Sequence, residues 1–429
     1  MLLNYEDLSA VRKSIEVEIP AERIATEAQR VTSEFGRHAK LPGFRPGKVP
    51  VNVVRTRFAK EIQEEVMSRL LPVSFHEAIE GKGLEPVGDP QLEHLDPFIE
   101  GAPVKYKARF EVKPQIELHE YRGIEVDDPK IEISDADVDA MIERLREQAS
   151  SYRVENDREL QEGDYAVIDI VSTAEGMETK RDSGHVKVGE ETPLPELHDS
   201  LRGMKPGGTT VVEKAYGDDA GTQEFRNRTI RHEVTVKEIR VQEKPEVTED
   251  FAKSIGGWES VEQMREVIGV DLRRHREAEV LRAKRNQVGE ALLDKHHFEV
   301  PEALVDEELG KSLQNYARFL ASQGVSLEKA DLDWRKIGED FRPEALKRAK
   351  RGLILEAIAR KEQIAVSDVE VDAEIRRAAR EQERDVAEVK HHLKQDGGYE
   401  ALRASLAQEK ALEMLISESK PREGGTVNR

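Results

Sequence analysis

An eight-residue loop near the N-terminus carries the residues best suited to binding chemistry. It reads Gly43-Phe44-Arg45-Pro46-Gly47-Lys48-Val49-Pro50. Its glycines allow turn conformations that are closed to other residues, and its prolines restrict the flanks and lower the entropy cost of binding. Phe44 can serve as an exposed apolar anchor, while Arg45 and Lys48 can pair with carboxylates or phosphates. The alternative is an ordinary tight turn between two helices, with Phe44 buried in the domain's own core.

The loop lies within a basic stretch of an acidic chain. The formal net charge of the 429 residues is −20, which argues against general nucleic-acid binding. Residues 36–60 nevertheless contain no acid and seven basic residues: Arg37, Lys40, Arg45, Lys48, Arg55, Arg57 and Lys60. A patch of this kind can steer a protein to a polyanion without making the whole surface adhesive.

Two predicted helices hold the loop in place. Alternating apolar residues predict strands over 14–19 and 104–112. Pro20 opens a helix with apolar residues at helical spacing up to Phe35, and a second helical stretch covers 51–80. We therefore predict an α/β domain over residues 1–115 in which the basic loop joins two helices.

Composition and periodicity change twice along the rest of the chain. Ser134 and Asp137 resemble a capping box at the start of a helix, and Ser367 begins a similar sequence; either one capped start is used twice, or both segments belong to one helical unit. Short strands are predicted at 167–171, Val186 and Val188, 209–212 and 229–239. Helices are predicted near 259–295, 302–322, 343–362, 368–395 and 398–419. The pattern predicts a multidomain α+β fold.

Several function classes have no support in the sequence. There is no cysteine, so disulfide and thiolate chemistry are excluded. No apolar run approaches a membrane span and no secretory signal is visible, so we expect a cytoplasmic protein without membrane contact. The pairs His296-His297 and His391-His392 lack the companions that a metal site needs. No nucleotide-binding or hydrolase motif is present, so we expect neither cofactor nor metal.

The loop sequence resembles the signature of the bacterial trigger factor family, and the order of domains is similar from end to end. The resemblance implies a ribosome-binding domain over 1–115, docking through Gly43 to Lys48. It implies a linker helix region over 116–158 that packs with the C-terminal domain, and an inserted FKBP-like peptidyl-prolyl isomerase domain over 159–243. A discontinuous all-α chaperone domain with helical arms would occupy 244–429. The implied partners are the ribosome exit region, unfolded nascent polypeptides and a second copy of the chain.

The isomerase site implied by the family departs from its aromatic pattern. The matching positions are Ile170, Leu194, Leu197, Ala220 and His232. An apolar pocket favours the twisted amide of the rotation transition state, and this set lacks the aromatic rings of such a pocket. We therefore expect weak isomerase activity or none. Two alternatives stay open: a protein that is mainly a prolyl isomerase, and a periplasmic chaperone of similar helical build.

Overall fold

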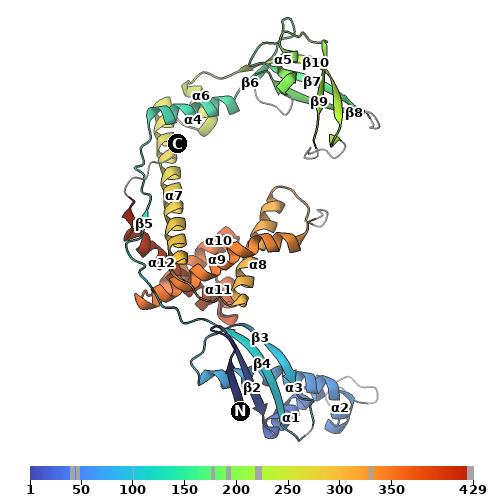
Figure 1. Cartoon of the computed structure of the whole chain (residues 1–429), viewed down its shortest axis with the longest axis vertical. Coiled ribbons are helices and arrows are strands. Elements are labelled where there is room, and N and C mark those ends of the chain that lie inside the picture. The colour runs from blue at the N-terminus through green and yellow to red at the C-terminus, as the bar shows by residue number, and fades with distance from the viewer. Residues whose placement is uncertain are drawn as a thin grey trace. The chain divides into compact units, whose positions relative to one another are not determined.

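A computed structural model describes residues 1–38, 44, 49–99, 101–174, 179–189, 195–217, 225–327 and 332–422. The chain divides into two compact units. The first unit combines residues 1–129 and 281–429, and the second contains residues 130–280. Figure 1 labels the helices and strands of both units.

The first unit begins with a small domain of one sheet and three helices, called here the sheet domain. Its four antiparallel strands follow the order β1-β2-β4-β3. They are β1 (Leu2–Asp7), β2 (Arg12–Ile19), β3 (Pro86–Leu95) and β4 (Val104–Val112). Alternate residues of β4 are buried, which leaves one apolar face for the helices to cover.

Three helices pack on that face: α1 (Ala21–His38), α2 (Val51–Arg57) and α3 (Ala59–Glu80). The core they share with the sheet includes an edge-to-face contact of Phe75 and Phe110, whose ring centroids lie 5.1 Å apart. The predicted strands and first helix are confirmed. The single helix predicted over 51–80 is wrong, because Phe58 has non-helical dihedral angles and separates α2 from α3.

The rest of the first unit is a helical body. It contains the second half of α7 (Val261–Lys295), α8 (Glu302–Ser322), α9 (Trp334–Lys361), α10 (Asp368–Glu381), α11 (Val386–Gln395) and α12 (Gly398–Ser417). Figure 1 shows α8 and α9 as a helical hairpin, called here the arm. The C-terminal strand β11 (Lys420–Pro421) pairs in parallel with β5 (Glu125–Val126), which fastens the segment that follows the sheet domain to this body.

The second unit contains a small sheet domain of its own, called here the β-domain. Its strands are β6 (Ser151–Val154), β7 (Tyr165–Thr173), β8 (Lys180–Lys187), β9 (Thr209–Ala215) and β10 (Thr229–Glu243), with helix α5 (Pro195–Leu201). The long strand β10 pairs with β6, β7 and β9, always antiparallel. Beside it, α4 (Asp135–Gln148) packs with α6 (Glu249–Gly256) and the first half of α7.

Several predicted boundaries change. The helix predicted over 368–395 is two helices, because Glu383 in the intervening turn has a φ of +53°. Helix α9 starts at Trp334, nine residues before the predicted position, with Asp333 as its N-cap. Both predicted capping boxes, at Ser134 and Ser367, are present. They lie in different units, so one capped start is used twice. The edge strands β1, β3 and β6 were not predicted.

Candidate functional site

The helices on either side of the basic loop are joined by an aromatic contact. Phe35, in the last turns of α1, lies 5.9 Å from Phe58, at the start of α3, measured between ring centroids. Val49 and Val54 are buried beside them. This contact fixes the spacing of the two helices that flank the loop.

Only part of the predicted docking loop lies within the described residues. Phe44 is described, and 41% of its surface is exposed, which is not the buried position of the alternative reading. Gly43, Arg45, Pro46, Gly47 and Lys48 lie outside the described residues. The neighbouring basic side chains Arg55, Arg57 and Lys60 are exposed on α2 and α3.

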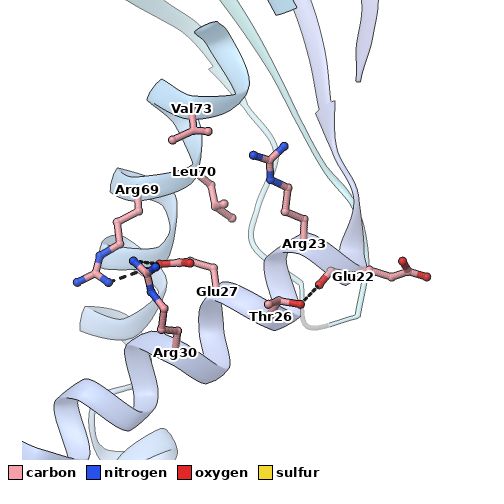
Figure 2. A pocket seen from close by; sticks show the side chains of 8 residues that line it. All are labelled: Glu22, Arg23, Thr26, Glu27, Arg30, Arg69, Leu70 and Val73. Atoms are coloured by element: carbon pink, nitrogen blue, oxygen red, sulfur yellow. Dashed lines mark hydrogen bonds and ion pairs between the residues drawn. The ribbon is translucent and has the colours of Figure 1, made fainter. Parts of the chain in front are cut away.

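An ion-pair network ties α1 to α3 and lines an open hollow of about 680 Å³ (Figure 2). The Arg69 guanidinium on α3 donates to Glu34 at 2.8 Å and to Glu65 at 2.7 Å, and its third contact is Glu27 at 3.5 Å. The hydrogen bond from Arg69 lowers the pKa of Glu34, and the same contacts raise the pKa of Arg69. Arg69 therefore holds the turns of α1 from which the basic loop leaves.

A second pair reinforces the same helices. Arg23 at the start of α1 donates two hydrogen bonds to the Glu77 carboxylate on α3, at 2.5 and 2.7 Å. This bidentate geometry gives the strongest hydrogen bonding between an arginine and a carboxylate. Between the arginines, the apolar side chains of Leu70 and Val73 form part of the lining of the hollow.

Three of the five predicted isomerase positions lie among the described residues of the β-domain. Ile170 is half-buried on β7, Leu197 is buried on α5, and His232 is buried on β10. Ile170 packs against the core that contains Leu197. Leu194 and Ala220 lie outside the described residues.

His232 has polar partners on both sides of its ring. Its Nδ1 lies 2.9 Å from the hydroxyl of Ser172, and its Nε2 lies 3.1 Å from the hydroxyl of Tyr216. Burial lowers its pKa, and the charge of Lys214 lowers it further. The ring is therefore neutral at pH 7 and is held by hydrogen bonds within the β-domain.

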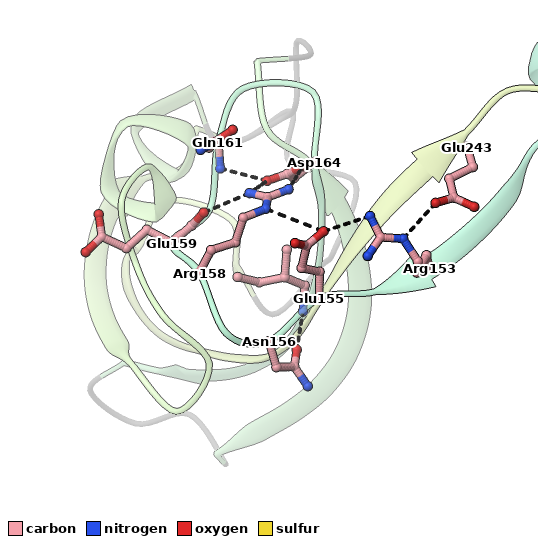
Figure 3. Close-up of polar contacts among 9 residues, drawn as sticks. Arg153, Glu155, Asn156, Arg158, Glu159, Gln161, Asp164 and Glu243 are labelled. Atoms are coloured by element: carbon pink, nitrogen blue, oxygen red, sulfur yellow. Dashed lines mark hydrogen bonds and ion pairs between the residues drawn. The ribbon is translucent and has the colours of Figure 1, made fainter.

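A chain of ion pairs closes the first loop of the β-domain (Figure 3). Arg158 binds the buried carboxylate of Asp164 through both terminal nitrogens, at 2.6 and 2.7 Å. Burial alone would raise the pKa of Asp164, but Arg158 and the backbone amide of Gln161 outweigh it, so the pKa is lowered. Glu155 continues the chain to Arg153, at 3.0 Å. These contacts position the loop.

The end of the arm far from its first turn carries four aromatic side chains, called here the aromatic patch: Tyr316, Phe319, Trp334 and Phe341. The ring of Tyr316 meets Trp334 and Phe341 edge-on, with centroids 6.4 and 5.5 Å away. Phe319 is 57% exposed and Trp334 is 37% exposed. Two large aromatic side chains exposed near the same end of the arm make this end a candidate interaction surface. The sequence did not indicate this patch, because its pattern predicts that α9 begins after two of these rings.

Within the described ranges, no three His, Asp or Glu side chains are grouped so as to hold a metal ion. None of the described helices is long and apolar enough to cross a membrane.

Comparison with known proteins decides the family. The family model described as "Bacterial trigger factor protein (TF)" matches residues 1–145, and the model of its C-terminus matches residues 260–417. The trigger factor of Solibacter usitatus is 33% identical over 411 residues, covering 95% of this chain and 97% of that protein. The trigger factor of Halothermothrix orenii is 31% identical over 425 residues, covering 97% and 99%. The chain belongs to the trigger factor family.

Trigger factors are chaperones, and this member assists the folding of nascent chains. The predicted family and multidomain α+β fold are therefore confirmed. Within this trigger factor, the structure locates a set of braced helices beside the signature loop, a β-domain with a polar core histidine, and an arm that ends in exposed aromatic rings.

Proposed function

We propose that this trigger factor docks at the ribosome exit region through the Gly43–Pro50 loop and works in the cytoplasm. Three observations support the proposal. The loop lies in an acid-free basic stretch, the helices that flank it are joined by the Phe35–Phe58 contact, and Phe44 is exposed. Arginine and lysine next to an exposed aromatic ring suit a surface of rRNA phosphate and acidic side chains.

The aromatic patch on the arm is the surface proposed to hold unfolded client segments. Its rings offer apolar contact area with little conformational entropy to lose. Basic side chains flank it, since Arg318, Arg335 and Lys336 are exposed on the same two helices. Unfolded chains expose apolar residues, so weak contacts with several rings allow binding without a fixed client sequence.

Two matched triple variants test these roles separately. Phe44→Ala, Arg45→Ala and Lys48→Ala remove one Phe, one Arg and one Lys from the loop, and Phe319→Ala, Arg335→Ala and Lys336→Ala remove the same residue types from the arm. We expect the loop triple to lose co-sedimentation with ribosomes and to keep its affinity for an unfolded client. We expect the arm triple to show the opposite pattern. Unchanged co-sedimentation of the loop triple would remove the docking role.

Prolyl isomerisation by this chain is proposed to be weak or absent. The support is the polar surrounding of His232, because both of its ring nitrogens have hydroxyl partners where the family pattern expects an apolar ring. Lowering an amide rotation barrier of roughly 18–20 kcal/mol needs an environment that favours the less polar twisted amide. A protease-coupled prolyl-peptide assay on the full chain tests this, and a high, inhibitor-sensitive rate would instead favour an isomerase as the main function.

A further inference from the structure

The arm begins at a helix N-terminus that lacks a cap of its own. Pro301 occupies the N-cap position of α8, and its side chain accepts no hydrogen bond. The first amide groups of a helix have no acceptor within the helix. Here the amide of Ala303 donates to Oε2 of Glu111 at 2.9 Å. Glu111 lies on β4, 192 residues earlier in the chain, so the sheet domain supplies the cap of the arm.

Close packing accompanies this hydrogen bond. Gly88 on β3 has a φ of +66°, and a Cβ added to it would lie 2.6 Å from the Cβ of Ala303. Carbon atoms attract at about 3.5–4.0 Å and repel strongly at the shorter distance. The contact between sheet domain and arm therefore requires a residue without a side chain at position 88.

Charged side chains hold both partners of this contact. Arg12 on β2 lies 3.3 Å from the other carboxylate oxygen of Glu111. On the arm, Arg342 of α9 pairs with Glu302 and, at 3.0 Å, with Asp306. The first turns of α8 are therefore tied to α9 on one side and to the sheet domain on the other.

The second helix of the arm has its own contacts with the sheet domain. Lys113, which follows β4, lies 2.7 Å from the carboxylate of Glu356 on α9. Arg360, one turn later, lies 3.2 Å from Glu85, next to β3. Both arm helices are thus fastened near their common base, whereas the aromatic patch lies beyond it. Ala303 and Tyr316 are separated by about 20 Å along α8 at the usual helical rise, so a tilt at the base moves the patch.

We propose that Glu111 and Gly88 brace the arm against the sheet domain, so that the docked domain sets the direction in which the aromatic patch points. The brace stands on the contacts alone. Its consequence for client binding rests on the function proposed for the patch. A chaperone built in this way presents the same face to every chain that leaves the ribosome.

Pulsed electron spin resonance between two labels tests the brace. The chain has no cysteine, so Glu80→Cys on α3 and Arg318→Cys on α8 place labels at two exposed positions only. We expect a narrow distance distribution for the labelled parent. Gly88→Ala should broaden or shift it. Gly83→Ala is the matched control, because Gly83 has a φ of +62° and no atom within 4 Å of the added Cβ.

Two further variants separate contact from strain. Adding Ala303→Gly to Gly88→Ala removes the colliding Cβ and should restore much of the narrow distance distribution. Glu111→Ala alone should broaden the distribution of the labelled parent in part. A broad distribution in the labelled parent, or equal behaviour of Gly88→Ala and Gly83→Ala, would overturn the brace. Client affinity is then measured on ribosome-bound protein, where Gly88→Ala should weaken binding. A changed label distance with unchanged client affinity would leave the brace standing and overturn its link to the patch.

Discussion

Ser172 and His232 face each other on β7 and β10, and the serine hydroxyl lies 2.9 Å from Nδ1 of the imidazole. The antiparallel register makes them direct partners across the sheet, so the hydrogen bond follows from strand pairing. Both residues are buried. A polar pair of this kind is stable only while each member keeps the other, because an unpaired buried polar group costs more than a made bond gains.

Ser172→Ala should therefore destabilise the β-domain beyond the loss of one hydrogen bond. We expect the free energy of local unfolding to fall by about 1–3 kcal/mol, the usual cost of an unpaired buried polar group. His232→Phe should cost a similar amount, and the double variant should cost less than the sum of the two. Hydrogen exchange of amides in β7 and β10 measures this in the full chain. Strictly additive effects would show that the two side chains do not interact.

Acid should weaken the β-domain through His232. Burial lowers the pKa of His232 in the folded protein, whereas an unfolded histidine has a pKa of about 6.5. The unfolded state therefore takes up the proton at higher pH. The contribution of neutral His232 to the free energy of unfolding is therefore complete above about pH 6.5. It decreases as the pH falls toward the folded-state pKa, by at most about 1.4 kcal/mol per pH unit.

The measurement is hydrogen exchange of β10 amides at two pH values on either side of that window, corrected for the intrinsic pH dependence of exchange. His232→Gln keeps hydrogen-bonding capacity but has no proton to gain, so it should remove most of the pH dependence. An unchanged dependence in that variant would assign the effect to other groups.

Local signals made much of the fold predictable. The alternation along Val104–Val112 gives one buried face, and the Ser134 and Ser367 capping boxes start helices as predicted. Edge strand β3 escaped prediction because seven consecutive residues of it are exposed, and two prolines, Pro86 and Pro90, interrupt its pattern. The split of α2 and α3 at Phe58 also escaped, because Phe58 keeps the apolar spacing of a continuous helix while its backbone departs from it.

The candidate sites likewise include features that a local sequence signal indicates and features that depend on contacts between distant residues. The docking role of the Gly43–Pro50 loop stays a prediction, and the sequence could suggest it because its residue types are concentrated in one short string. The Glu111–Ala303 and Ser172–His232 contacts could not, since 192 and 60 residues separate the partners. The aromatic patch depends on two helices meeting, and neither helix alone concentrates its rings.

The ion pair of Arg158 and Asp164 should be a main support of the first β-domain loop. Arg158→Ala would leave the buried carboxylate with only the Gln161 amide as partner. Breaking a buried pair typically costs about 3–5 kcal/mol, and the partial exposure of Arg158 places this case near the lower value. Hydrogen exchange of amides 159–164 provides the measurement. Arg153→Ala is the control, since it removes a more exposed arginine of the same chain of ion pairs and should have a small effect.

Arg69 should affect docking without contacting the docked surface. Arg69 donates a hydrogen bond to Glu34 near the end of α1, and the basic loop follows that end. Arg69→Met should therefore loosen the turns that position the loop. The substitution removes the guanidinium but keeps the unbranched aliphatic part of the side chain. We expect faster hydrogen exchange in the second half of α1 and a several-fold weaker affinity for ribosomes, with client affinity unchanged. Arg23→Met is the matched control, because it removes a bidentate ion pair at the opposite end of the same helix. Equal loss of ribosome affinity in both variants would mean that α1 responds as a whole, and that Arg69 has no special role in positioning the loop.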